Sequence, residues 1–156
     1  MAVKIFVDQG HNPYGFNAGA EAFGVREQDI TYLVGAYLVD ILNADPRFDA
    51  IASRQTPDEI LGYDNNSSLR ERVDMANTWG ADYFISIHTN ANTNPAINGT
   101  ECYVYSQNNP AFYLAEDIVS QIDGGSAQKT TGSMSAPPSM CCAGRRCLPS
   151  SSNLPI

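Results

Sequence analysis

Short apolar runs and stretches of helical spacing alternate along most of the chain. The runs are rich in β-branched and aromatic residues and are bounded by turn residues, which is typical of buried strands. We expect strands at residues 3–8, 48–53, 83–87 and 101–106. Between them, apolar residues recur every three or four positions, as they do on one face of a helix. This alternation predicts a single α/β domain with a twisted, mostly parallel or mixed sheet flanked by helices.

Three helices are expected, two between these strands and one after the last of them. In the first, seven apolar residues share one face over about four turns, and Asp45-Pro46 is a suitable stop. The seven are Ile30, Leu33, Val34, Tyr37, Leu38, Ile41 and Leu42. The second helix is expected over about 68–79, ended by Gly80, and the third is expected to open at Pro110. The inner face of the third helix would carry Ala115, Ile118, Val119 and Ile122.

The character of the chain changes at about Gly124. All 17 acidic residues lie at or before Asp123, whereas three of the four cysteines follow it among serines and prolines. These three are Cys141, Cys142 and Cys147. Their spacing fits no common zinc-binding pattern, and Cys102 is isolated in an expected strand, so neither a metal knuckle nor a disulfide framework is favoured. We expect a domain over residues 1–128, incomplete at its C-terminal end, and an aberrant, disordered tail over 129–156.

Composition and charge narrow the choice of partners. The chain has 43% apolar and 17% charged residues, which is enough apolar material for a core, and its formal net charge is −8. That charge repels phosphate backbones and anionic lipids, so we expect no nucleic-acid partner and no membrane partner, and we expect a monomer. The sequence from Met1 shows no export signal. We therefore expect synthesis in the cytoplasm.

Both histidines follow expected strands, His11 after the first and His88 after the third. Because side chains at the carboxyl ends of neighbouring strands converge, the two imidazoles are expected to meet. Residues 10–24, rich in glycine and asparagine, favour a loop bending around a site, and Glu27 follows at the start of the first helix. Two imidazoles and one carboxylate leave tetrahedral zinc an open position for water, as in catalytic sites. The same ligands also suit ferrous iron.

Five segments of the chain together resemble the zinc-dependent N-acetylmuramoyl-L-alanine amidases. They match that family in order and spacing, and the resemblance runs from Val3 to about Gln128. The segments are residues 7–12, 24–30, 72–77, 84–91 and 99–101. The resemblance implies zinc as cofactor with His11, Glu27 and His88 as ligands. It also implies peptidoglycan or a muropeptide as substrate, cut at the amide between muramic acid and the first alanine.

The resemblance further implies where other residues act. Arg72 and Asn77 would brace the fold, and Asn90 and Asn92 would line the cleft. An enzyme of this kind would act on the cell wall after release or lysis of the producing cell.

The chain departs from the family at its C-terminal end. Those amidases carry there a strand of the type Met-Pro-Ala-Val-Leu-Val-Glu-Leu, whose glutamate is the general base and proton donor. This chain has no glutamate after Glu116. Losing a positioned general base costs on the order of a hundred- to ten-thousand-fold in rate. The catalytic residues therefore stay unassigned.

The genetic code offers an explanation for the missing strand. If each codon's third base is read with the first two bases of the next codon, Met140-Cys141 must give valine and Cys141-Cys142 must give leucine. Later steps permit Met-Pro-Ala, three aliphatic residues and, at Ser152-Asn153, glutamate. We hypothesise that the reading frame slipped by one base between about Gly124 and Gly132.

Two classes of function follow from these observations. One is a peptidoglycan amidase, intact in the restored frame or impaired as written. The other is a catalytically impaired zinc-containing module that binds cell-wall fragments. An iron-dependent oxygenase is disfavoured because no anchor for a 2-oxoacid is recognisable in the sequence.

Overall fold

The computed structural model describes residues 1–89, 99–104 and 110–122, together with the backbone of residues 140–144. The first three expected strands form, within a residue of their predicted ends. The strands are β1 (Val3–Gln9), β2 (Glu21–Ala22), β3 (Val25–Arg26), β4 (Phe48–Ala52), β5 (Tyr83–Ile87) and β6 (Met140–Gly144). The helices are α1 (Glu27–Asn43), α2 (Asn65–Trp79) and α3 (Pro110–Ile122).

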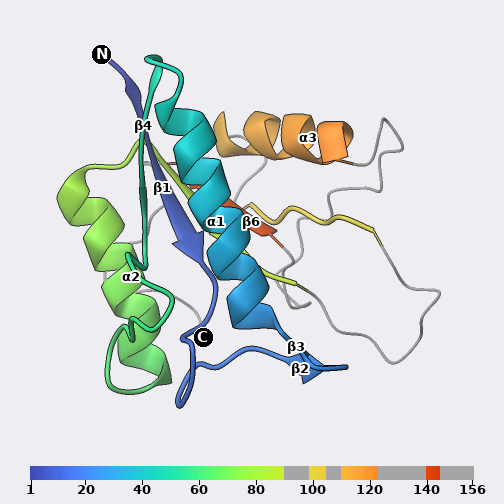
Figure 1. Cartoon of the computed structure of the whole chain (residues 1–156). Coiled ribbons are helices and arrows are strands. Elements are labelled where there is room, and N and C mark those ends of the chain that lie inside the picture. Colours follow the sequence, from blue (N-terminus) through green and yellow to red (C-terminus); the bar gives the residue numbers. More distant parts are fainter. Residues whose placement is uncertain (90–98, 105–109, 123–139, 145–156) are drawn as a thin grey trace.

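The main sheet has the strand order β4-β1-β5-β6 (Figure 1). Strand β1 pairs in parallel with both β4 and β5, and β6 pairs antiparallel with β5. This mixed sheet confirms the predicted α/β class. The central position of β1, next to β5, brings the carboxyl ends of these two strands to the same edge of the sheet.

Helices cover both faces of the sheet (Figure 1). On one face, buried Ile5, Val7 and Ile85 pack with residues of α1 and α3. On the other face, Phe6 and Phe84 stack with ring centroids 5.6 Å apart, next to Ala76 and Met75 of α2. Alternate residues of β1 therefore enter two separate apolar layers, as expected for a strand buried on both faces.

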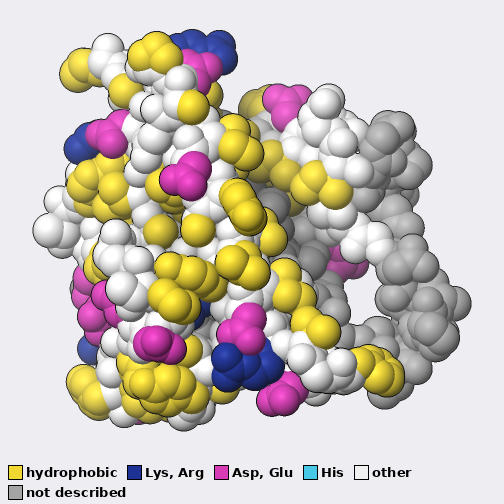
Figure 2. Space-filling view, in the orientation of Figure 1, with side chains coloured by type: hydrophobic (Ala, Val, Ile, Leu, Met, Phe, Trp, Pro, Cys, Tyr) yellow, Lys and Arg dark blue, Asp and Glu magenta, His cyan; other side chains and the backbone are white. Residues whose placement is uncertain are grey.

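Helix α1 forms as predicted, but most of its predicted apolar face points to solvent. The exposed fractions of Leu33, Val34, Tyr37 and Ile41 lie between 45% and 68%, and apolar side chains cover much of the front of the molecule, where α1 lies (Figure 2). A neighbouring face of α1 packs against the sheet instead. Leu38, Val39 and Leu42 of this face contact the core, and Thr31 and Gly35 are buried. The apolar arc of α1 is wider than the sheet can cover, so spacing alone misplaced its centre.

The ends of α2 and α3 are set by local signals. Asp64 caps α2 by accepting a hydrogen bond from the backbone of Ser67, whose own side chain accepts from the backbone N–H of Asp64. This capping box starts α2 at Asn65, earlier than predicted. Gly80 ends the helix as predicted, and the structure shows it in the left-handed conformation. Pro110 opens α3 as predicted, but Ile122 is 55% exposed instead of facing inward.

Two further expectations need correction. The loop over residues 10–24 is not wholly irregular, because β2 lies within it and pairs antiparallel with β3. Residues 101–104 of the expected strand 101–106 form no strand beyond a single bridge residue at Tyr103, and the remainder of that strand lies outside the described residues. Strand β6 falls within the predicted tail, whose remaining residues also lie outside the described part.

None of the helices in the described part is long and apolar enough to cross a membrane.

Candidate metal centre

The fold brings together the three residues that the sequence nominated as metal ligands. His11 follows β1, His88 follows β5, and Glu27 is the first residue of α1. One donor atom from each residue can be chosen so that all of them lie within 4.8 Å of one another. The Glu27 side chain is 6% exposed, and those of His11 and His88 are 19% and 24% exposed. The cluster is therefore largely shielded from solvent, with its imidazoles at the open side.

The spacing of the donor atoms fits a tetrahedral metal ion. The distance from His11 Nε2 to His88 Nδ1 is 3.1 Å, from His11 Nε2 to Glu27 Oε2 it is 3.2 Å, and from His88 Nδ1 to Glu27 Oε1 it is 3.3 Å. Zinc–ligand bonds of about 2.0–2.1 Å in tetrahedral geometry separate neighbouring donors by about 3.3–3.4 Å. The two glutamate distances involve different oxygens of Glu27, so the carboxylate faces both imidazoles, and the three residues could hold a divalent metal ion between them.

Backbone groups orient the carboxylate and one imidazole. The N–H of Ala20 donates to Glu27 Oε2 at 3.1 Å, and the N–H of Thr89 donates to Glu27 Oε1 at 2.8 Å. His11 Nδ1 lies 3.2 Å from the carbonyl oxygen of Asn17, which can only accept, so Nδ1 carries the proton and Nε2 presents its lone pair to the cluster. No sequence signal marks these backbone partners, because any residue type can supply them.

The local electrostatics favour the protonation states that bind a metal. Burial alone would raise the pKa of Glu27, but the N–H groups of Thr89 and Ala20 and the nearby imidazoles outweigh it and lower that pKa. Burial, followed by the proximity of His11, lowers the pKa of His88, although Asp8 and Glu27 oppose this. A carboxylate and neutral imidazoles are the forms that coordinate divalent cations.

Two glycines let the loop pack directly against the ligands. A Cβ atom on Gly10 would lie 2.6 Å from Cε1 of His88, and one on Gly19 would lie 2.9 Å from Cδ2 of His11 and 2.8 Å from Cβ of Glu27. Real Cβ atoms do not approach other atoms so closely. A larger residue at Gly10 would press on the backbone of Ile87 and on the His88 ring, and one at Gly19 would press on His11 and Glu27.

A buried ionic cluster lies behind the ligands. Arg72 Nη1 donates to Asp8 Oδ1 at 2.6 Å, and the hydroxyl of Ser86 donates to Asp8 Oδ2 at 2.7 Å. Burial would raise the pKa of Asp8, but Arg72 and Ser86 hold it below its usual value. Arg72 thus has the bracing position that the sequence suggested, whereas Asn77 is exposed on α2. Asn90 and Asn92 lie outside the described residues.

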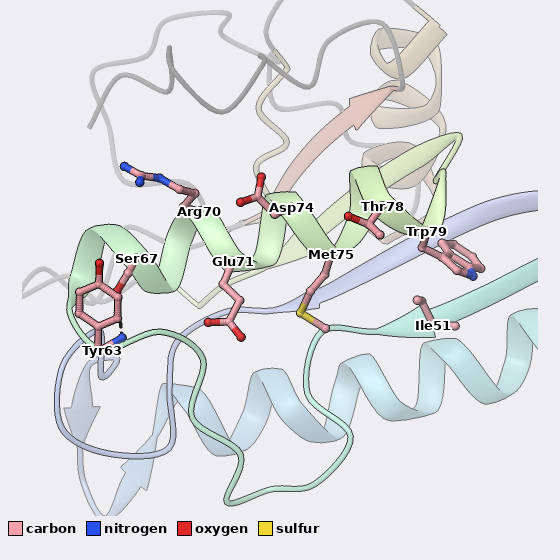
Figure 3. A pocket seen from close by; sticks show the side chains of 9 residues that line it. All are labelled: Ile51, Tyr63, Ser67, Arg70, Glu71, Asp74, Met75, Thr78 and Trp79. Carbon is pink, nitrogen blue, oxygen red and sulfur yellow. Dashed lines mark hydrogen bonds between the residues drawn. The ribbon is translucent and has the colours of Figure 1, made fainter.

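A separate groove of about 700 Å³ runs along the outer side of α2 (Figure 3). It is lined by Ile51, Tyr63, Ser67, Arg70, Glu71, Asp74, Met75, Thr78 and Trp79. Glu71 and Met75 point toward the chain that follows β4, whereas Arg70 and Asp74 point to the opposite side of the helix (Figure 3). None of these residues belongs to the histidine–glutamate cluster, so the groove and the candidate metal centre are separate features of the described part.

Fold and site together define an α/β domain with a candidate metal centre of two histidines and one glutamate. Comparison with known proteins identifies the family. A profile of the N-acetylmuramoyl-L-alanine amidases matches residues 5–143, so the chain belongs to this family.

Individual relatives agree with this assignment. The chain is 37% identical over 103 residues to N-acetylmuramoyl-L-alanine amidase CwlM of Bacillus licheniformis, and 35% identical over 103 residues to a sporulation-specific N-acetylmuramoyl-L-alanine amidase of Bacillus subtilis. Each alignment covers 66% of this chain and 36% of the relative, so the chain spans about a third of their length.

A solved structure supports the fold. The crystal structure of an N-acetylmuramoyl-L-alanine amidase from Clostridium difficile superposes with a TM-score of 0.67 at 23% identity. The superposition covers 90% of this chain and 78% of that one.

Proposed function

We propose that this chain is a zinc-dependent amidase domain that hydrolyses the amide between N-acetylmuramic acid and L-alanine in peptidoglycan. The observation that carries the proposal is the convergence of His11, Glu27 and His88, whose nitrogen and oxygen donors lie 3.1–3.3 Å from one another, close to the spacing of neighbouring ligands around zinc. Membership of the amidase family supports the substrate and the bond that is cut.

The three residues have distinct tasks in this proposal. His11 Nε2, His88 Nδ1 and one oxygen of Glu27 hold the ion, and the backbone donors to Glu27 keep that carboxylate ionised and oriented. When bound, zinc polarises a carbonyl oxygen and lowers the pKa of water toward neutrality. Zinc is proposed over ferrous iron because hydrolysis needs a Lewis acid and no change of oxidation state, and because the chain belongs to the N-acetylmuramoyl-L-alanine amidases.

The residue that would transfer protons during hydrolysis is not yet assigned. The given sequence has no glutamate after Glu116, where the family resemblance leads us to expect the general base. This observation favours one alternative, a zinc-containing module that binds cell-wall fragments without cleaving them. The proposed one-base slip between about Gly124 and Gly132 would restore the enzyme. Sequencing the source DNA from the codon of Gly124 past that of Ile156 tests it directly.

Metal analysis tests the ligand assignment. After dialysis against zinc and then buffer, the chain should retain about one zinc ion, which His11→Ala and His88→Ala should each lose. Glu21→Gln is the matched control, because Glu21 is an exposed carboxylate on β2 close to the site in sequence. Equal zinc content in all four proteins would remove the ligand assignment.

Turnover separates the two functions. Purified muropeptides are incubated with the zinc-loaded chain, and free stem peptide is measured. Release that stops after chelation and returns with zinc supports the amidase. Saturable binding of muropeptide without release supports the binding module instead.

A further inference from the structure

His11 has an unusual backbone conformation for a metal ligand. Its φ angle is +71°, in the left-handed region that residues with a Cβ atom rarely adopt. Such a conformation persists only where the surrounding structure imposes it. Because the backbone at His11 sets the direction of the imidazole, whatever imposes this conformation also places Nε2 in the cluster.

The guanidinium group of Arg72 holds the backbone on both sides of this turn. Nη1 donates to the carbonyl oxygen of Gln9 at 2.7 Å, and Nη2 donates to the carbonyl oxygen of His11 at 2.8 Å. Nη2 also donates to Oδ1 of Asn12 at 3.1 Å. A planar guanidinium grips two carbonyls at a fixed separation, which a lysine ammonium cannot reproduce. Arg72 therefore clamps the chain one residue before and one residue after Gly10.

The clamp is itself anchored to the strand that delivers the other histidine. Arg72 is 2% exposed, and its charge is balanced by Asp8 of β1 at 2.6 Å. The second oxygen of Asp8 accepts from Ser86 of β5, two residues before His88. A continuous path of short hydrogen bonds thus joins β5, β1 and α2 to the carbonyl of His11. The two imidazoles are fixed relative to each other by this path.

We propose that Arg72 is a positioning residue of the metal centre, acting through the backbone of His11. Its guanidinium keeps His11 in the left-handed conformation and so preorganises Nε2 toward His88 and Glu27. This inference rests on the proposed zinc function, because it concerns the affinity and geometry of that site.

Zinc affinity is the first test, measured by competition with a chromophoric chelator on the full chain. Arg72→Lys should bind zinc about 10- to 100-fold more weakly, the usual effect of losing a group that orients a metal ligand. Two controls on the same helix separate positioning from general effects. Arg70→Lys makes the same chemical change at an exposed site, and Val73→Ala truncates a buried side chain of the same helix. Both controls should bind zinc within about twofold of the parent.

A double-mutant cycle shows whether Arg72 acts through His11. His11→Gly removes the imidazole and tolerates a positive φ, and free imidazole supplies the missing ligand. In this background, Arg72→Lys should change zinc affinity by less than about twofold. Additive losses would overturn the proposal, because an arginine that only stabilises the fold would act independently of residue 11. The visible spectrum of bound Co²⁺ should change in Arg72→Lys and stay unchanged in Val73→Ala.

A milder variant keeps the test valid if Arg72→Lys does not fold. Ser86→Ala releases one oxygen of Asp8 and should weaken zinc binding severalfold in the same direction. Unchanged affinity in a folded Arg72→Lys protein overturns the role of Arg72, and unchanged affinity in a folded Ser86→Ala protein overturns the path through Asp8. A parent chain that binds no zinc at all overturns the proposed zinc function instead, so the two failures are distinguishable.

Discussion

Replacing Gly35 by alanine separates helix propensity from tertiary packing. Gly35 lies in the interior of α1, where alanine is intrinsically better than glycine by about 1 kcal/mol. On that basis alone, Gly35→Ala stabilises the protein. The structure predicts the opposite, because a Cβ atom at this position would overlap Cγ of the buried Gln9 and lie 3.2 Å from its Cδ.

The size of the effect follows from what Gln9 must do. Its side chain accepts from the backbone N–H of Arg54 at 2.9 Å and donates to the carbonyl oxygen of Tyr32 at 3.2 Å. Overpacking costs about 1–3 kcal/mol, and each weakened hydrogen bond costs about 1 kcal/mol more. After the gain of about 1 kcal/mol in propensity, Gly35→Ala should destabilise the protein by about 1–4 kcal/mol.

Urea unfolding measures this free energy directly. Ala36→Gly, at the next position of α1, is the matched control and should cost about 1 kcal/mol from propensity. In a Gln9→Ala background the overlap disappears, so Gly35→Ala should then be neutral or stabilising. A stabilised Gly35→Ala protein, or a loss that is the same with and without Gln9, would refute the packing argument.

Three further predictions follow from the contacts of single residues. Gly10→Ala should weaken zinc binding about 10- to 100-fold, because its Cβ atom would lie 2.6 Å from the His88 ring; chelator competition measures this. Phe6→Ala should cost about 3–5 kcal/mol in urea unfolding, because the ring is fully buried and stacked on another phenylalanine. Hydrogen bonds from Arg47 lower the pKa of Asp45 to about 2, and Arg47→Gln should return it toward 3.8 in an NMR titration. Since the pKa of Asp45 is lowered by folding, its stabilising contribution is present above about pH 3.8 and is lost as the pH falls through about 2.

Each of these has an outcome that contradicts it. Unchanged zinc affinity in a folded Gly10→Ala protein would show that His88 can move aside without loss. Phe23→Ala is the control for Phe6, because Phe23 is fully exposed and its removal should leave the unfolding free energy unchanged. A loss below about 1 kcal/mol for Phe6→Ala would contradict its place in the core. A pKa of about 2 that persists in Arg47→Gln would assign the shift to the backbone.

The metal cluster shows which parts of the candidate site could be predicted from the sequence and which could not. The apolar runs before His11 and His88 predict strands, and parallel pairing of β1 and β5 then requires the two imidazoles to share one edge of the sheet. Glu27 could be nominated from its position after a glycine-rich loop. The sequence could not predict that Ala20 and Thr89 would donate to its carboxylate, because backbone donors carry no side-chain signature.

Local sequence features determined which segments became strands and helices, and they also determined several of the ends of these elements. Period, caps and turn residues act over a few neighbours, so Gly80 and Pro110 could be assigned as boundaries from the sequence alone. Only the tertiary structure decided which face of α1 is buried. Its apolar arc is broad, and in the folded chain the helix is turned so that Gly35 lies against Gln9 and Glu27 enters the cluster.

The role of Arg72 was likewise decided by the tertiary structure and not by the local sequence. A single arginine in a helix is ordinary in sequence, and only the family resemblance, not the local pattern, singled it out from exposed Arg70. Its clamp on Gln9 and His11 joins residues more than 60 positions apart. Contacts at that separation exist only after α2 packs on the sheet, because only the packed arrangement brings the guanidinium to those carbonyls.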